Sequence, residues 1–246
     1  MAWARRFIAA LIAGSGEAPA PPQSNAQVIG AAYADPTTRY AHGVLGDAVE
    51  WGSLILWVDT CIDCARQRIE QRKLTLPATR VFEDIAPRLI TLDVDGQMAA
   101  MVVESHADRG ARLALYGATG LIATTPFIGQ RHRWLAPIGA GDLDGDGKVE
   151  IAYIDRPHLA KRLRVWRFEG GALHHVADLD GLTNHRIGWD FIAGGLRDCG
   201  QGPEMITANA DWTRIMATRL AEGALSARDI GAFTGPKGLS TAITCN

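Results

Sequence analysis

The sequence has almost no net charge. It carries 25 Lys and Arg residues against 27 Asp and Glu residues, a formal net charge of −2 over 246 residues. Proteins that bind nucleic acid or an anionic membrane surface usually show a basic patch or stripe. The charge balance therefore argues against a nucleic-acid ligand, and we expect the partner to be an unknown protein or carbohydrate.

The sequence also lacks an apolar run long enough to cross a membrane, which takes about 20 residues. A short apolar run, residues 7–14, follows Arg5 and Arg6 and precedes a stretch of small residues and prolines that ends at Ala26. This order is typical of an export signal, although an Ala/Pro-rich disordered tail is the alternative. We expect a signal peptide over residues 1–26 and a periplasmic or secreted, monomeric product without a transmembrane segment.

Cysteine is scarce, with four residues in the whole chain. An even number in an exported chain indicates disulfides, and three pairings are possible. We favour Cys61 with Cys64 and Cys199 with Cys245, because the second pair would tie the end of the chain to an earlier element. The Cys-x-x-Cys spacing also fits a redox site or half of a zinc site, but no βαβ pattern or second ligand pair accompanies it.

A sustained helical periodicity is missing as well. Short apolar or alternating runs recur instead, separated by clusters of Gly, Asp, Asn and Pro, and this spacing is typical of strands. Residues 59–72 are polar, and we interpret them as a loop or an irregular strand. We expect one all-β domain over residues 27–246, with strands that include residues 52–58, 98–103, 111–116, 149–154, 163–168 and 204–207.

A repeat organises these strands. Residues 85–103 and 134–153 share an Ala-Pro pair, a Leu-Asp pair and a following strand, and residues 191–206 form a third copy. Aligning Ala100, Glu150 and Glu204 gives periods of 150 − 100 = 50 and 204 − 150 = 54 residues.

A looser fourth copy starts at Tyr40, with Glu50 at the aligned position. Four strands in about 50 residues is the signature of a propeller blade, whereas a β-sandwich would explain the strands but not the repeated order. We predict a small β-propeller of about four blades, near residues 40–84, 85–130, 131–185 and 186–246. A final strand over residues 239–245 would close the ring.

The loop at residues 142–150 carries the clearest chemical signal. Asp142, Asp144, Asp146 and Glu150 occupy loop positions 1, 3, 5 and 9, and Lys148 at position 7 offers its backbone carbonyl. Calcium prefers six or more oxygen ligands, which a tight loop supplies from alternate residues. Position 12 lacks the Glu of an EF-hand, and both flanks predict strands rather than helices. An acidic, solvated turn is the alternative.

This loop and its flanking strands resemble the FG-GAP or VCBS-type repeat, the calcium-binding blade of integrin α-subunit propellers and of many bacterial exported proteins. The family pattern is Asp-x-Asp-x-Asp-Gly-x-x-Asp, and this sequence has Glu150 in place of the last Asp. The resemblance implies a calcium-binding β-propeller that acts as a binding or assembly module. The loops of the other copies have lost most of the ligands, so we expect one Ca²⁺ ion with a structural role.

A second group of polar residues lies where the inner strands are expected to begin. In a propeller these positions surround the central channel, where they would bind an anionic or sugar-like ligand or only hydrogen-bond blade to blade. The candidate ligand-binding residues are His42, Arg133, His185, Arg186 and Asp190.

The sequence lacks the common catalytic motifs, including a Gly-x-Ser-x-Gly elbow and a His-Glu-x-x-His pair. The alternative to a binding module is a small hydrolase or lyase at the channel mouth. It would use His185, Arg133 and Asp190 for acid/base and anion-holding roles. We do not assign a catalytic residue.

Overall fold

The computed structural model describes residues 26–93 and 96–245. The expected signal peptide lies outside this part of the chain, apart from Ala26. The described residues form an all-β structure of antiparallel strands with one short helix, α1 (Pro236–Ile243). The strands are β1 (Gln27–Thr37), β2 (Glu50–Asp59), β3 (Ile69–Thr75), β4 (Arg80–Phe82), β5 (Arg88–Thr91), β6 (Met98–His106), β7 (Gly110–Gly117), β8 (Gly120–Thr124), β9 (Leu135–Gly141), β10 (Val149–Asp155), β11 (Arg162–Glu169), β12 (Ala172–Asp180), β13 (Leu182–Thr183), β14 (Gly195–Asp198), β15 (Pro203–Asn209), β16 (Arg214–Ala221) and β17 (Ala224–Ala232).

The strands form four consecutive antiparallel meanders, which agrees with the repeat. The first is β1-β2-β3, the second β5-β6-β7-β8, the third β9-β10-β11-β12 and the fourth β14-β15-β16-β17. Strand β4 pairs with both β2 and β6 and so joins the first two meanders into one eight-stranded sheet. The first meander begins at β1, earlier than the blade boundary expected near residue 40.

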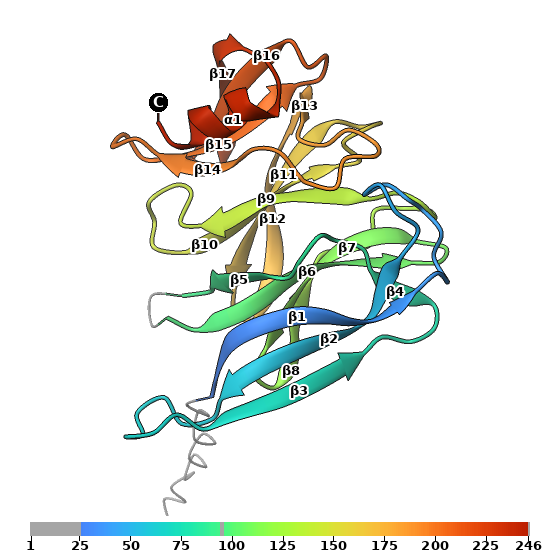
Figure 1. Cartoon of the computed structure of the whole chain (residues 1–246). Coiled ribbons are helices and arrows are strands. Elements are labelled where there is room, and N and C mark those ends of the chain that lie inside the picture. The colour runs from blue at the N-terminus through green and yellow to red at the C-terminus, as the bar shows by residue number, and fades with distance from the viewer. Residues whose placement is uncertain (1–25, 94–95, 246) are drawn as a thin grey trace, which may run out of the picture.

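The meanders pack face to face in chain order, as Figure 1 shows from β1 to β17. Successive side chains of a strand point to opposite faces, so the second strands of the last three meanders, β6, β10 and β15, each contribute to two hydrophobic clusters. In β6, Met101 packs in a cluster with Ile151 of the third meander. Its neighbour Val102 packs in another cluster with Leu54 of the first meander. This double burial explains why β6 is apolar nearly throughout.

The C-terminal segment is a correction to the sequence prediction. Residues 239–245 were expected to form a strand that closes a ring, but Pro236–Ile243 is a helix. Pro236 stands at the first turn, where its missing N–H costs nothing. Leu239 and Ala242 are three residues apart and bury one helical face against Ile206 of the fourth meander.

Ring closure by the C-terminal segment is therefore wrong. Helix α1 covers the outer face of the fourth meander, and the first and fourth meanders lie at opposite ends of Figure 1. In the described part of the chain, no strand of the fourth meander pairs with a strand of the first. The loop before β2 does reach the segment before β14, where the backbone N–H of Gly188 donates to the carbonyl oxygen of Val44 over 3.2 Å.

Both favoured disulfides are confirmed. Cys61 bonds to Cys64 in the turn between β2 and β3, and Cys199 bonds to Cys245. The second bond fastens the end of α1 to the turn between β14 and β15. Two disulfides indicate an oxidising compartment. None of the helices in the described residues has the length and apolar character needed to cross a bilayer.

Candidate functional site

The turn between β9 and β10, residues 142–150, is called the acidic turn below. It brings together three of the four carboxylates expected from the sequence, because one carboxylate oxygen from each of Asp142, Asp144 and Asp146 lies within 4.8 Å of the others. The backbone holds them there. Asp142 accepts hydrogen bonds from the N–H groups of Gly145 and Gly147, over 2.7 and 2.9 Å. Both glycines have positive φ, a conformation that glycine adopts without steric cost.

Glu150 stands apart from that group. Its carboxylate accepts from the Leu143 N–H over 2.9 Å and from Arg167 Nε over 2.6 Å. Burial raises the pKa of Glu150, against the opposing effect of these two hydrogen bonds. The ammonium group of Lys148 bonds to Glu169 of β11, as expected for a residue that offers only its backbone to a metal.

Arg167 is the functional residue that the sequence reasoning missed. It lies on β11 directly opposite Glu150, and its guanidinium contacts Asp144 over 2.6 Å and Asp146 over 3.0 Å. One arginine thus partly neutralises the acidic turn. The repeat could have indicated this contact, because an arginine also faces the aligned glutamate in the fourth meander, where Arg219 pairs with Glu204.

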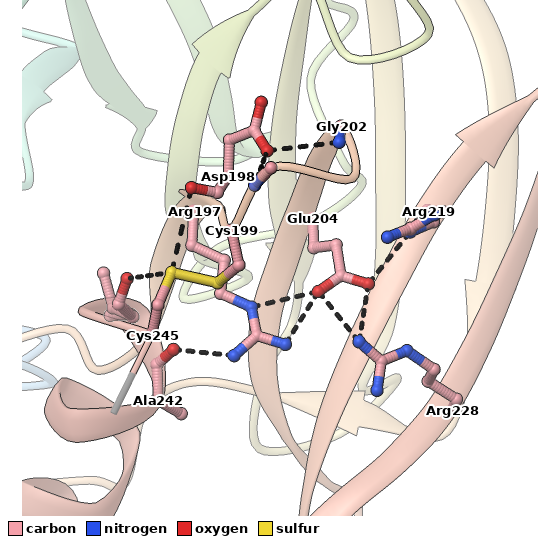
Figure 2. Close-up of polar contacts among 11 residues, drawn as sticks. Arg197, Asp198, Cys199, Gly202, Glu204, Arg219, Arg228, Ala242 and Cys245 are labelled. Carbon is pink, nitrogen blue, oxygen red and sulfur yellow. Dashed lines mark hydrogen bonds and ion pairs between the residues drawn. A yellow bond between two sulfur atoms is a disulfide. The ribbon is translucent and has the colours of Figure 1, made fainter.

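The aligned position in the fourth meander shows the same pairing in a stronger form. Figure 2 shows the Glu204 carboxylate between Arg197 and the pair Arg219 and Arg228, beside the Cys199–Cys245 bond. Burial disfavours the charged form of Glu204, but the hydrogen bonds from the three arginines outweigh it and lower its pKa to about 2.

Each meander fastens the turn before its second strand with an aspartate. Asp47 accepts from the Val49 N–H, Asp93 from the Gln97 N–H, and Asp198 from the N–H groups of Gly200 and Gly202. An aspartate that accepts backbone hydrogen bonds thus fastens this turn in all four meanders. Among the described residues, only the acidic turn adds two further carboxylates close enough to share a cation.

The sequence matches no known family model and no curated protein.

Two of the five candidate ligand-binding residues belong to a cluster of histidines and aromatic rings. The rings of His42 and His132 stack with their centroids 4.7 Å apart, and His42 Nδ1 lies 2.5 Å from Glu83 Oε1. Nearby, His185 Nδ1 lies 3.0 Å from His158 Nε2, and Trp134 contacts both of these rings. We call these five residues (His42, His132, Trp134, His158 and His185) the histidine cluster.

The histidine cluster leaves almost no space between its rings. Its cavity has a volume of about 30 Å³, room for a single water molecule and not for a sugar ring. His185 is fully buried, and its second nitrogen lies 3.0 Å from the carbonyl oxygen of Trp189, so neither ring nitrogen is available to a substrate. Burial and the neighbouring His185 lower the pKa of His158 to about 4.

Of the five candidates, only His42 lines this cavity. The Arg186 guanidinium lies 4.7 Å from the centroid of the Trp212 ring, and Asp190 is exposed to solvent. Arg133 is half-buried and precedes Trp134 at the start of the third meander. The structure therefore does not bring His185, Arg133 and Asp190 together as an acid/base set.

Proposed function

We propose that this chain is an exported, calcium-stabilised protein of four propeller-like blades in an open arrangement that acts as a binding module. The observation that carries the proposal is the acidic turn, in which carboxylate oxygens of Asp142, Asp144 and Asp146 lie within 4.8 Å of one another. The four meanders of similar order support the blade assignment, and the two disulfides support export.

The donor set suits a hard divalent cation. Calcium takes carboxylate and carbonyl oxygens, and three carboxylates held within one turn repel one another unless a cation neutralises them. Asp142, Asp144 and Asp146 would hold the ion, with the Lys148 backbone carbonyl and Glu150 as the remaining expected ligands. Calcium would compete with the guanidinium of Arg167 for Asp144 and Asp146, since Arg167 contacts both.

The role of the ion in this proposal is structural. The acidic turn joins β9 to β10, and β10 is buried along its full length between the second and fourth meanders. An ion that fixes this turn would therefore stabilise the centre of the stack rather than a peripheral loop.

Melting temperature measured with calcium and with a chelator tests the proposal. A ligand present at 100 times its Kd stabilises the folded state by about 2.7 kcal/mol, which is a rise of roughly 5–10 °C for a chain of this size. An unchanged melting temperature in 1 mM Ca²⁺ would rule out the structural ion.

Asp146→Asn and Asp93→Asn form a matched pair for the same experiment. Each aspartate accepts one backbone hydrogen bond of 2.9 Å in the turn before the second strand of its meander. Both variants should lose a similar amount of stability in chelator. Only Asp146→Asn should also lose the response to calcium, and an equal response in both would place the ion elsewhere.

A further inference from the structure

A cleft between the second and third meanders offers the space that the histidine cluster lacks. It consists of two adjoining hollows of about 620 and 370 Å³, which share Pro126, Phe127, Gly129 and Trp166 in their walls. Sites for small molecules usually measure about 300–1,000 Å³. This cleft is therefore large enough to hold a small-molecule ligand.

Arg109 is the first chemical feature of the cleft. Its guanidinium lies 4.3 Å from the centroid of the Phe127 ring. In the part of the chain that the structure describes, Arg109 makes no ion pair, in contrast to Arg112 on the same ring, which donates two hydrogen bonds to Glu104. Stacking on an aromatic face orients a guanidinium while its N–H groups stay available for a carboxylate.

The opposite wall of the cleft carries two further arginines. Arg156 and Arg164 both line it, and both donate to the single carboxylate of Asp155. Asp155 also lines this wall, and Arg164 lies 3.7 Å from Asp178 as well. The two arginines of this wall are therefore paired, and Arg109 is the cation of the cleft without an ion pair among the described residues.

The remaining lining suits a ring that carries hydroxyl groups. Trp166 donates its indole N–H to the Tyr153 hydroxyl over 3.1 Å, so its side chain presents an aromatic surface rather than a donor. The Phe127 ring is covered by the guanidinium groups of Arg109 and Arg112 and so orients these two cations, and Thr124 adds a hydroxyl group. Aromatic faces pack against the C–H face of a sugar, and side-chain hydroxyls bond to its OH groups.

We propose that this cleft binds an acidic saccharide through a uronic acid residue, with Arg109, oriented by Phe127, holding the carboxylate and Trp166 packing against the ring. The proposal rests on the assignment of the chain as a binding module and names the ligand class. An acidic peptide is the competing occupant, but a compact cavity walled by two aromatic rings fits a single ring better than an extended chain.

Isothermal titration with digalacturonate, in 1 mM Ca²⁺, tests this site. The matched neutral ligand is galactobiose, which has the same length without the carboxylates. We expect digalacturonate to bind and galactobiose to bind at least about tenfold more weakly, because a carboxylate–arginine contact is a charge-assisted hydrogen bond. Absence of digalacturonate binding, equal binding of both sugars, or tighter binding of an oligo-glutamate peptide would each overturn the proposal.

The variants Arg109→Gln and Arg131→Gln distinguish binding in the cleft from nonspecific electrostatic attraction to the protein. Arg131 also lies over an aromatic ring, that of Tyr40 at 5.5 Å, but outside the cleft. Only Arg109→Gln should weaken digalacturonate binding, by about tenfold or more. Equal losses in both variants would show nonspecific attraction and reject the site.

Titration and melting temperature measured on the same unaltered protein separate this inference from the calcium proposal. Sugar binding by an unaltered protein whose melting temperature does not respond to calcium would overturn the structural ion and leave the cleft intact. A normal calcium response without sugar binding would do the reverse.

Discussion

Three glutamates at one position of the repeat show how the neighbouring residues decide the charge of a buried carboxylate. Glu204 has three arginine partners and a pKa lowered to about 2, and Glu150 has one arginine partner. Glu50 has no arginine partner in the described residues, and burial, with the nearby carboxylates of Glu83, Asp47 and Asp84, raises its pKa to about 9. Glu204 therefore stabilises the fourth meander, whereas Glu50 lowers the stability of the first meander at neutral pH.

Glu50→Gln should stabilise the protein at neutral pH. The folded state holds Glu50 protonated up to about pH 9, whereas the unfolded chain releases the proton near the ordinary value of 4.5. Stability therefore falls as the pH rises between these two values, and a neutral amide removes this loss. Urea unfolding should show a gain of about 1–3 kcal/mol at pH 7 and little change at pH 4.

Glu204→Gln is the control with the opposite sign. Its folded pKa is depressed, so its contribution is present above pH 4.5 and is lost as the pH falls toward 2. Removing this charge should cost about 3 kcal/mol at pH 7, because three arginines lose their shared partner. A stabilised Glu204→Gln, or a Glu50→Gln gain that persists at pH 4, would contradict the assigned charges.

At the scale of the elements, the strands that the sequence located well are those buried on both faces. Strands β6 and β10 are apolar at most positions, and such a short apolar run predicts a strand that is buried on both faces. Strand β1 was missed because its sequence contains Gly30, Pro36 and several alanines, which are weak strand signals, and it is held in place by pairing with β2. The structure of β1 is thus decided by its partner.

Helix α1 was mistaken for a strand for a related reason. Its apolar and polar residues alternate over only a few positions, which was interpreted as a strand, although Leu239 and Ala242, three residues apart, share a face only in a helix. Packing against the fourth meander and the carbonyl contact from Ala242 to Arg197, shown in Figure 2, select the helix.

Removing the Cys199–Cys245 bond should loosen α1. The bond closes a loop with a sequence separation of 46 residues, so its loss should cost roughly 2–4 kcal/mol in urea unfolding. The matched control is removal of Cys61–Cys64, whose separation is 3 residues and whose loss should cost less. Equal costs for the two double Cys→Ser variants would mean that the C-terminal bond is not an effective restraint on the unfolded chain.

At the scale of the whole molecule, the repeat predicted the number and order of the meanders, but not what ends the stack. That depends on α1, whose place on the fourth meander is set by a disulfide and by one buried helical face. The sequence likewise indicated the three aspartates of the acidic turn, because they are close in the chain. It did not indicate Arg167, which reaches that turn from a neighbouring strand.

The candidate ligand-binding residues stay a prediction, and the sequence could not indicate where the larger cavities lie. His42 and His185 do come together with other rings, but the volume left between side chains depends on packing and cannot be obtained from residue types. The roomier cleft combines Arg109 and Phe127 of one segment with Trp166 of the next meander.

Calcium binding counted by equilibrium dialysis tests the central claim most directly. We predict one calcium ion per chain for the unaltered protein and for Asp93→Asn, and none for Asp146→Asn. No bound calcium in the unaltered protein, or two or more ions per chain, would contradict the account of a single structural ion in the acidic turn.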